Sequence, residues 1–405
     1  MQELLRIVLI LSLSSTCLCH GLVNNEASKV LNVLNHGAVG DGETDDSQAF
    51  LEAWKSLCEV EAAYVTPMLV VPEGKKFLLK PVIFQGPCKS DSVHVQVLGT
   101  LLAPDTMEGW INCPSHCWLR FSNVSNLIVS GSGEINGRGS IWWNQSYVQA
   151  LHFHKCNNLH LRELIHRDSP KNHISIDSCN GATLSYLHIS APEKSPNTDG
   201  VDISSSTFVS IHDSYIGTGD DCIAINGNTA HINITRVSCG PGHGISVGSL
   251  GAHGAHETVE EVYVQNCNFT GTMNGARIKT WQGGSGYARN ILFEQIQFME
   301  VKNPIIIDQF YCNGGHNCKN MTSSVQVSNV TYRGIEGTSA SHNAIALNCD
   351  EIKCTNIVMD RINITSSIAG NPAFASCNNA EGKSSCTTPE VSCLTSDKKD
   401  CDSGQ

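Results

Sequence analysis

Three five-residue segments, DGVDI (199–203), DCIAI (221–225) and HGISV (243–247), follow one another at intervals of 22 residues. In each segment apolar residues occupy the third and fifth positions, which is the alternation of a half-buried β-strand. Repeats of this length, built from strands and turns without helices, indicate a solenoid in which each repeat packs on its neighbours. The three segments are therefore predicted to stack on successive coils of one solenoid.

The same pattern extends over residues 120–370. Corresponding apolar positions between Ile174 and Ile345 are separated by 27, 22, 22, 31, 29 and 40 residues. A second series of strands, such as 159–161 and 208–211, precedes the first within the repeats. An antiparallel sandwich also has many short strands, but the repeated order of strand pairs favours a parallel β-helix. We predict an all-β, single-domain, right-handed parallel β-helix.

Both ends of the solenoid have their own sequence character. Residues 35–46 (NHGAVGDGETDD) are rich in Gly and Asp and are interpreted as a turn. Asp45 or Asp46 can cap a short N-terminal helix over 47–58, whose apolar residues have helical spacing. Residues 377–405 form a polar, cysteine-rich tail, which we expect to cap the open end, because an uncapped end exposes unpaired backbone.

Cysteine usage and the first residues indicate export. Nineteen cysteines are typical of an oxidising compartment. Arg6 precedes an apolar run over 7–13, so residues 1–20 are interpreted as a secretory signal and 21–405 as the mature domain. We therefore expect a secreted glycoprotein of the extracellular space or cell wall. Seven N-x-S/T sequons support this prediction: Asn123, Asn144, Asn233, Asn268, Asn320, Asn329 and Asn363.

The charge balance restricts the possible partners. The net charge is −12 and no basic run is present, which argues against a nucleic-acid partner. No segment after the signal is apolar enough to cross a bilayer, so we expect no membrane partner. We expect a monomer. A polyanionic ligand would need a local basic spot to overcome the global repulsion.

The repeats align a group of polar residues. Asp199, Asp221 and His243 each lie two positions before an inward apolar residue, and equivalent positions on adjacent coils are ~4.8 Å apart. Asp220 adjoins the middle position. Three carboxylates and an imidazole in a small area are costly to ionise fully, so at least one carboxyl pKa should rise. An acid with a raised pKa beside an ionised base is what hydrolysis of a glycosidic bond requires.

The next coil supplies positive charge. Arg277 and Lys279 flank the inward Ile278, so both should point outward near the carboxylates. A guanidinium beside an ammonium suits a carboxylate on a substrate. A local basic pair in an acidic protein therefore predicts an acidic sugar polymer as the substrate.

Strand parity conflicts with this arrangement unless the chain bends. Unbroken alternation would turn Asp199 and Asp221 inward, where a carboxylate needs partners. We predict a bend before each strand, at Gly200, Gly219 and Gly244, that keeps these carboxylates out of the core. A carboxylate buried in the core would contradict this prediction.

Each motif also has an ordinary explanation. An isolated Asn-Thr-Asp-Gly is usually a turn, and 219–221 alone could be a turn or a calcium ligand. His243 could be structural, and Arg277 and Lys279 could belong to a solvated face. The shared register on consecutive coils favours a site. No HExxH or zinc-type Cys/His spacing is present, so we expect no metal and no cofactor.

At these residues the chain resembles the polygalacturonases, family 28 of the glycoside hydrolases, in their plant form. The matching motifs are SPNTDG (195–200), GDDC (219–222), CGPGHGIS (239–246) and RIK (277–279). The resemblance extends over nearly the whole mature chain. It implies a right-handed parallel β-helix and hydrolysis of α-1,4-linked galacturonan with inversion.

The resemblance also implies residue roles. Asp220 would be the general acid, Asp199 and Asp221 would hold and deprotonate the attacking water, and His243 would support the protonation state of the acid. In substrate binding, Arg277 and Lys279 would hold the galacturonate carboxylate, and Tyr311 would contact the substrate. Asn197 would orient Asp199 or contact the substrate.

The family pattern implies a Cys222–Cys239 disulfide between the turn that carries Asp220 and the turn that carries His243. Short spacing indicates Cys349–Cys354 and Cys312–Cys318, and Cys58–Cys88 is a further candidate. Cys179 and Cys267 are expected to be buried free thiols.

Other functions are compatible with the same pattern. Exo action or hydrolysis of rhamnogalacturonan are alternatives to the favoured endo action on homogalacturonan. A pectate-lyase-like enzyme would hold Ca²⁺ with the three aspartates, although His243 and the basic pair favour hydrolysis. A non-catalytic wall-binding β-helix would tolerate Asp220→Asn.

Overall fold

The computed structural model describes residues 29–62, 65–111, 117–143, 148–312, 321, 324–396 and 401. The expected secretory signal (1–20) lies outside the described residues, as do Asn144, Asn320 and Cys318.

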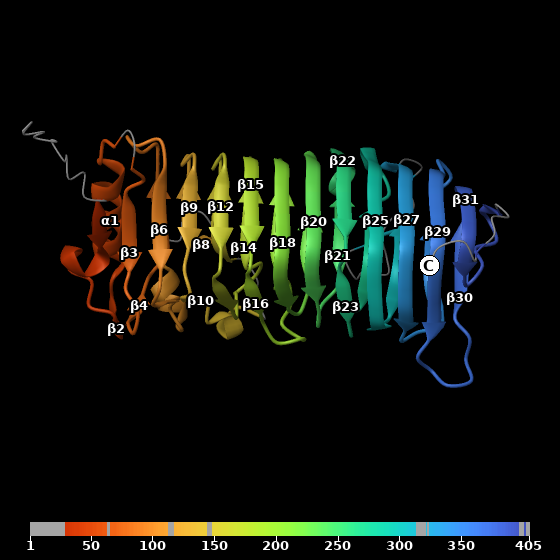
Figure 1. Cartoon of the computed structure of the whole chain (residues 1–405), viewed down its shortest axis with the longest axis horizontal. Coiled ribbons are helices and arrows are strands. Elements are labelled where there is room, and N and C mark those ends of the chain that lie inside the picture. Colours follow the sequence, from red (N-terminus) through yellow and green to blue (C-terminus); the bar gives the residue numbers. More distant parts are fainter. Residues whose placement is uncertain are drawn as a thin grey trace, which may run out of the picture.

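The chain is a parallel β-helix whose coils follow one another along a single long axis (Figure 1). One face is an 11-stranded parallel sheet, and this sheet carries the candidate site. Its strands in chain order are β5 (Val82–Gln85), β8 (Cys117–Ser122), β11 (Gln149–His154), β14 (Ile174–Asp177), β17 (Val201–Ser204), β19 (Ile223–Ile225), β21 (Ile245–Leu250), β24 (Asn274–Thr280), β26 (Asn303–Asp308), β28 (Asn343–Asn348) and β30 (Phe374–Asn378).

The remaining strands form a 21-stranded parallel sheet that closes the other sides of the solenoid. They are β1 (Val30–Asn32), β2 (Asp41–Asp45), β3 (Met68–Val71), β4 (Lys76–Leu78), β6 (Val93–Val97), β7 (Thr100–Leu102), β9 (Leu127–Ser130), β10 (Glu134–Asn136), β12 (Leu159–Arg162), β13 (Ile165–Arg167), β15 (Asn180–Ser185), β16 (His188–Ser190), β18 (Thr207–Gly217), β20 (Thr229–Cys239), β22 (His256–Gln265), β23 (Asn268–Thr270), β25 (Ser285–Val301), β27 (Gln326–Ser339), β29 (Cys354–Ser366), β31 (Ala380–Thr388) and β32 (Thr395–Ser396).

The strand register confirms the predicted repeat. Ile174 pairs with Val201, Val201 with Ile223, and Ile223 with Ile245. The pairing then continues through Ala276 and Ile305 to Ile345. Every interval in the series, from 22 to 40 residues, therefore corresponds to one coil.

The inward residues of the strands form one continuous apolar core along the axis. Val201, Ile223 and Ile245, which lie on three adjacent strands of the 11-stranded sheet, are each 0% exposed. Because side chains alternate across a strand, the residues between them face outward. The core thus fixes which side chains the outer face presents.

The predicted helix is present as α1 (Ser47–Cys58), with Ala49, Phe50 and Trp54 buried. The predicted cap is only partly right. Asp46 is at the N-cap position without capping the helix, because its carboxylate accepts hydrogen bonds from the backbone N–H of Val39 and Gly40. The Asp45 carboxylate instead accepts from the N–H of Ser47 at 3.1 Å.

The interpretation of residues 35–46 as a turn is wrong for its second half. Residues 41–45 form β2, which pairs in parallel with β4 and so belongs to the first coil of the solenoid. Pairing with a neighbouring coil satisfies backbone groups that a local Gly- and Asp-rich turn would leave to solvent. Four short 3₁₀ helices are described: η1 (Val33–His36), η2 (Met107–Trp110), η3 (Gly139–Ile141) and η4 (Ala252–Gly254).

Three predicted disulfides are present: Cys58–Cys88, Cys222–Cys239 and Cys349–Cys354. The tail carries two more, Cys377–Cys393 and Cys386–Cys401, and its strands β31 and β32 extend the large sheet. Cys179 and Cys267 are buried thiols, as expected, and Cys156 is a third. No helix among the described residues is long and apolar enough to span a membrane.

Candidate active site

The site lies where the chain bends into β17, β19 and β21. Bends occur at Gly200, at residues 219–220 and 222, and at residues 241–243. Two of the glycines predicted at these bends are required for different reasons. A Cβ on Gly200 would lie 2.4 Å from Cγ2 of Ile216 and 2.5 Å from the Cys222 carbonyl oxygen. Gly244 has φ +81°, a left-handed conformation that favours glycine.

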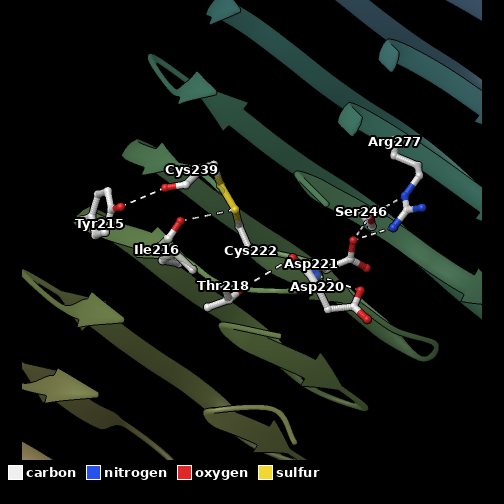
Figure 2. The surroundings of a disulfide bond; sticks show 10 residues. Tyr215, Ile216, Thr218, Asp220, Asp221, Cys222, Cys239, Ser246 and Arg277 are labelled. Carbon is white, nitrogen blue, oxygen red and sulfur yellow. Dashed lines mark hydrogen bonds and ion pairs between the residues drawn. A yellow bond between two sulfur atoms is a disulfide. The ribbon is translucent and has the colours of Figure 1, made fainter. Parts of the chain in front are cut away.

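The Cys222–Cys239 disulfide holds the middle bend in place. It links the residue after Asp221 to the end of β20, four residues before His243 (Figure 2). The backbone N–H of His243 also donates to the Asp220 carbonyl at 2.7 Å. Covalent and backbone contacts therefore join the two turns that carry the acidic and imidazole groups.

Asp220 is the centre of one set of contacts. Its Oδ1 lies 2.9 Å from Nδ1 of His243 and also accepts the backbone N–H of Asp221 at 2.9 Å. Its other oxygen, Oδ2, lies 3.5 Å from the side-chain amide of Asn197. Asn197 therefore contacts Asp220, whereas the sequence suggested Asp199 as the carboxylate that it orients.

Asp221 is the centre of a second set. Its Oδ1 accepts hydrogen bonds from Nη2 of Arg277 at 2.5 Å and from the Ser246 hydroxyl at 2.9 Å. Its Oδ2 accepts from Nζ of Lys279 at 2.8 Å. Arg277 also donates from Nε to Ser246 at 2.8 Å. Figure 2 shows Asp221 directed toward Ser246 and Arg277.

Bends were predicted to keep the carboxylates out of the core, and Asp221 is nevertheless buried. This residue is only 1% exposed, although its carboxylate contacts outward-facing groups rather than core side chains. Arg277 and Lys279, at 9% and 7% exposed, cover it. A buried carboxylate is tolerated here because two cations and a hydroxyl satisfy it.

The backbone ladder of Asp199, Asp221 and His243 is in register, but their side chains do not form a simple row. Val201, Ile223 and Ile245 pair on adjacent strands, which aligns the residues two positions earlier. The side chain of His243 nevertheless contacts Asp220 rather than Asp221. Of the two adjacent aspartates on the bend, Asp220 therefore contacts the imidazole, and Asp221 is left to other partners.

Asp199 and Asp220 differ in proton affinity. Burial, followed by the charges of Asp202, Asp220 and Asp221, raises the pKa of Asp199 well above its ordinary value. Burial also acts to raise the pKa of Asp220, but the hydrogen bond and charge of His243 and the charge of Lys279 outweigh it and lower that pKa. The expected rise in a carboxyl pKa thus falls on Asp199 rather than on Asp220.

Sequence reasoning missed Asp202 and Ser246. Burial raises the pKa of Asp202 to about 7, and its Oδ1 is buried without a hydrogen-bond partner among the described residues. Both residues are the middle members of apolar–polar–apolar triplets, Val201–Ile203 and Ile245–Val247. Those middle positions face outward between core residues, so the alternation itself carried the signal.

Tyr311 lies beside the basic pair. Nζ of Lys279 is 5.2 Å from the centre of the Tyr311 ring, within range of a cation–π contact. The ring also packs edge-on against Trp281, with centroids 5.7 Å apart. An aromatic wall thus stands next to the cations on one side of the site.

Asp220, Asp221 and His243 have possible metal-ligand atoms within 4.8 Å of one another. A calcium ion is a poor match for this set, because calcium prefers oxygen ligands and Asp221 is already neutralised by Arg277 and Lys279. The arrangement instead combines carboxyl groups of unequal proton affinity with two cations. It can donate a proton, accept a proton and hold an anionic group.

Comparison with known proteins gives consistent results. The family model described as "Glycosyl hydrolases family 28" matches residues 62–386. The chain is 51% identical over 376 residues to a probable polygalacturonase of Arabidopsis thaliana, which covers 91% of this chain and 81% of that protein. It is 42% identical over 389 residues to polygalacturonase-2 of Solanum lycopersicum, with 91% and 83% covered.

Solved structures are similar in fold. The endo-xylogalacturonan hydrolase of Aspergillus tubingensis superposes with a TM-score of 0.76 at 23% identity, over 87% of this chain and 96% of that chain. The polygalacturonase of Erwinia carotovora gives a TM-score of 0.70 at 21% identity, again over 87% and 96%.

Proposed function

Because the chain belongs to family 28 of the glycosyl hydrolases, we propose that it hydrolyses the α-1,4-galacturonosyl linkages of homogalacturonan in pectin. The observation that carries the proposal is the pairing of two functions on one face. Asp220 with His243 offers acid–base chemistry, and Arg277 and Lys279 contact the adjacent residue, Asp221. Two cations face the single carboxylate of Asp221, so positive charge remains to attract a carboxylate on the substrate.

The proposed reaction inverts the anomeric centre. Asp220 donates a proton to the glycosidic oxygen, and Asp199 and Asp221 hold and deprotonate a water molecule on the opposite side of the sugar. His243 is hydrogen-bonded to Asp220 and sets its protonation. The bond from the anomeric carbon to the leaving oxygen breaks as the water oxygen attacks, and the leaving oxygen takes the proton of Asp220.

A lowered pKa is unfavourable for a general acid, and the charge of the substrate resolves this conflict at Asp220. A galacturonate carboxylate held by Arg277 and Lys279 adds a negative charge next to Asp220. It also cancels part of the charge of Lys279, one of the groups that lowers the pKa of Asp220. Both effects raise that pKa, so the proton is taken up as the correct substrate binds.

The first experiment is product analysis with de-esterified polygalacturonate and an Asp220→Asn control. New reducing ends on saturated products support hydrolysis, whereas unsaturated products would indicate a lyase. We propose endo action, for which a ladder of oligomers and rapid loss of viscosity are expected; monomer alone would mean exo action. Absence of products from folded protein would overturn the proposal for homogalacturonan.

A second experiment separates the acid from the base. An aryl galacturonide with a good leaving group needs little proton donation, so Asp220→Asn should recover much of its turnover on that substrate. Asp199→Asn should not recover, because this variant lacks one of the two carboxylates that activate the water, and a better leaving group does not replace it. Recovery in Asp199→Asn and not in Asp220→Asn would exchange the two roles.

We also propose that the protein acts outside the cell as a monomer. The disulfides among the described residues support an oxidising compartment. Expression in a plant cell with a tag at the C-terminus, followed by assay of the wall and culture fluid, tests the location. Retention of the tagged protein inside the cell would contradict it.

A further inference from the structure

A second cluster of metal-binding side chains lies outside the catalytic group. His152 and His154 are two residues apart on β11, and Asp177 is paired with His154 across to β14. All three face outward on the 11-stranded sheet. His152 is in register with Ser175 and then with Asp202, so the cluster lies two coils before the catalytic group on the same face.

The spacing of the cluster suits one ion. One ligand atom from each of the three residues lies within 4.8 Å of the others. The two imidazole rings have centroids 6.1 Å apart. His154 and Asp177 are 23% and 27% exposed, so the cluster is partly shielded but accessible. Neighbouring strands of a rigid sheet hold all three, which limits the reorganisation needed for binding.

A hydrogen bond from outside the cluster orients His152 as a ligand. Nδ1 of His152 is 2.6 Å from the Gln149 side-chain oxygen, which places the proton on Nδ1 and leaves the lone pair on Nε2. Metal-binding histidines are held in this way, with the other ring nitrogen donating to an acceptor. Nδ1 of His154 is instead 2.5 Å from Oδ2 of Asp177, within the cluster, so an ion bound by these two atoms would replace the proton between them and release it to solvent.

The carboxylate is held as well. Oδ1 of Asp177 accepts hydrogen bonds from the hydroxyls of Ser178 and Ser204, at 3.3 and 3.2 Å. Its second oxygen is the one that faces His154. The two serines thus hold Oδ1 in position and leave Oδ2 directed at the cluster.

The charges near the cluster act in both directions. Arg120 lies beside His152, in register on the neighbouring strand β8. Its guanidinium repels a cation, and the carboxylate of Asp177 offsets that charge. An ion that binds strongly to imidazole is therefore needed.

We propose that His152, His154 and Asp177 form a binding site for a divalent transition metal of the zinc type. Two imidazoles and a carboxylate suit Zn²⁺ and leave at least one coordination position toward the outer face. The site is independent of the proposed hydrolysis. Linear motifs could not reveal it, because the histidines are two residues apart and the carboxylate comes from the next coil.

The test is titration of the metal-stripped protein with Zn²⁺ by calorimetry. We expect one site in the wild type. Loss of a residue that only orients a metal ligand lowers metal affinity by about 10- to 100-fold. His152→Ala and His154→Ala each remove a ligand, so each should lower the affinity of the site for Zn²⁺ by more than this. Gln149→Ala, which removes only the orienting acceptor of His152, should produce a smaller loss within that range.

Two controls decide between sites. His160 is an exposed histidine on β12 of the other sheet, so His160→Ala should leave Zn²⁺ binding unchanged. His243→Ala removes the imidazole of the catalytic cluster and should also leave it unchanged. Loss of binding in His243→Ala, or unchanged binding in His152→Ala and His154→Ala variants that melt like the wild type, would overturn the proposal. So would absence of Zn²⁺ binding by the wild type.

Discussion

Asp220 and Asp221 are adjacent in the chain, yet their side chains have separate partners. Asp220 contacts His243 at 2.9 Å, and Asp221 contacts Arg277 and Lys279 at 2.5 and 2.8 Å. The bend that carries them thus presents one carboxylate to an imidazole and buries the other beneath two cations. Substitutions at the two positions should consequently have different effects.

Asp220→Asn should remove turnover and leave the fold intact. The amide cannot donate a proton to the glycosidic oxygen, and loss of a general acid typically lowers the rate by ~10²–10⁴-fold. The measurement is kcat on polygalacturonate together with thermal melting and pectin binding. Wild-type turnover in this variant would contradict the mechanism.

Arg277→Met should destabilise the protein as well as weaken substrate binding. The change leaves the buried carboxylate of Asp221 with Lys279 and Ser246 alone, and breaking a buried pair costs ~3–5 kcal/mol. The matched control is Arg236→Met, because Arg236 pairs with Asp213 at 2.6 Å but has a side chain that is 57% exposed. That pair should contribute about 0–1 kcal/mol. If both variants lose the same free energy of unfolding in urea, burial of the Asp221 pair does not make that pair more important for stability.

The carboxyl group of Asp202 should contribute less to stability as the pH rises from about 4 to about 7, whereas the buried His173, whose pKa burial lowers to about 4, contributes in the opposite direction. Burial raises the pKa of Asp202 from 3.8 to about 7, so in this range the folded state holds a proton that the unfolded state has lost. Unfolding then releases a proton and becomes easier at higher pH, by up to about 1.4 kcal/mol per pH unit for one group. The raised pKa of Asp199 acts in the same direction.

Urea unfolding across this pH range measures the effect, and Asp202→Asn is the diagnostic variant. An amide does not titrate, so the stability of the variant minus that of the wild type should increase as the pH rises through this range. The same slope in both proteins would mean that Asp202 does not hold the proton.

Replacement of both Cys222 and Cys239 by Ala should lower stability and turnover together. The disulfide closes a loop with a sequence separation of 17 residues, and a loop near this size contributes about 3 kcal/mol. It also holds the Asp220 bend against the His243 turn, so kcat should fall more than KM rises. The control is the Cys349–Cys354 pair, far from the site along the chain, whose loss should leave kcat unchanged. If kcat falls by the same factor in the control, the Cys222–Cys239 disulfide does not position the site.

The sequence predicted the fold well because the core repeats. Ile174, Val201, Ile223 and Ile245 are aligned by hydrophobic alternation alone, and their pairing follows from it. Residues 41–45 were misread because pairing with β4 is a contact with a distant segment, whereas Gly and Asp content is a local signal.

The site could be predicted as a set of residues but not as a set of contacts. Register brings Asp199, Asp221 and His243 to one face, yet side-chain rotation on the bend decides that His243 contacts Asp220 and that Asp221 lies beneath Arg277. Proton affinity depends on these same rotations. The carboxyl pKa values therefore required coordinates. The outward position of Asp202, in contrast, follows from the apolar alternation of 201–203.

The intervals between paired positions vary from 22 to 40 residues, but the pairing along the 11-stranded sheet continues from coil to coil. Extra length is therefore taken up outside the 11-stranded sheet, partly in longer strands such as β25, which has 17 residues where β18 has 11. Coil length and the register of the outer face are separable variables in this architecture. An engineer could lengthen or exchange the segments outside this sheet while the paired strands that carry the candidate site stay the same.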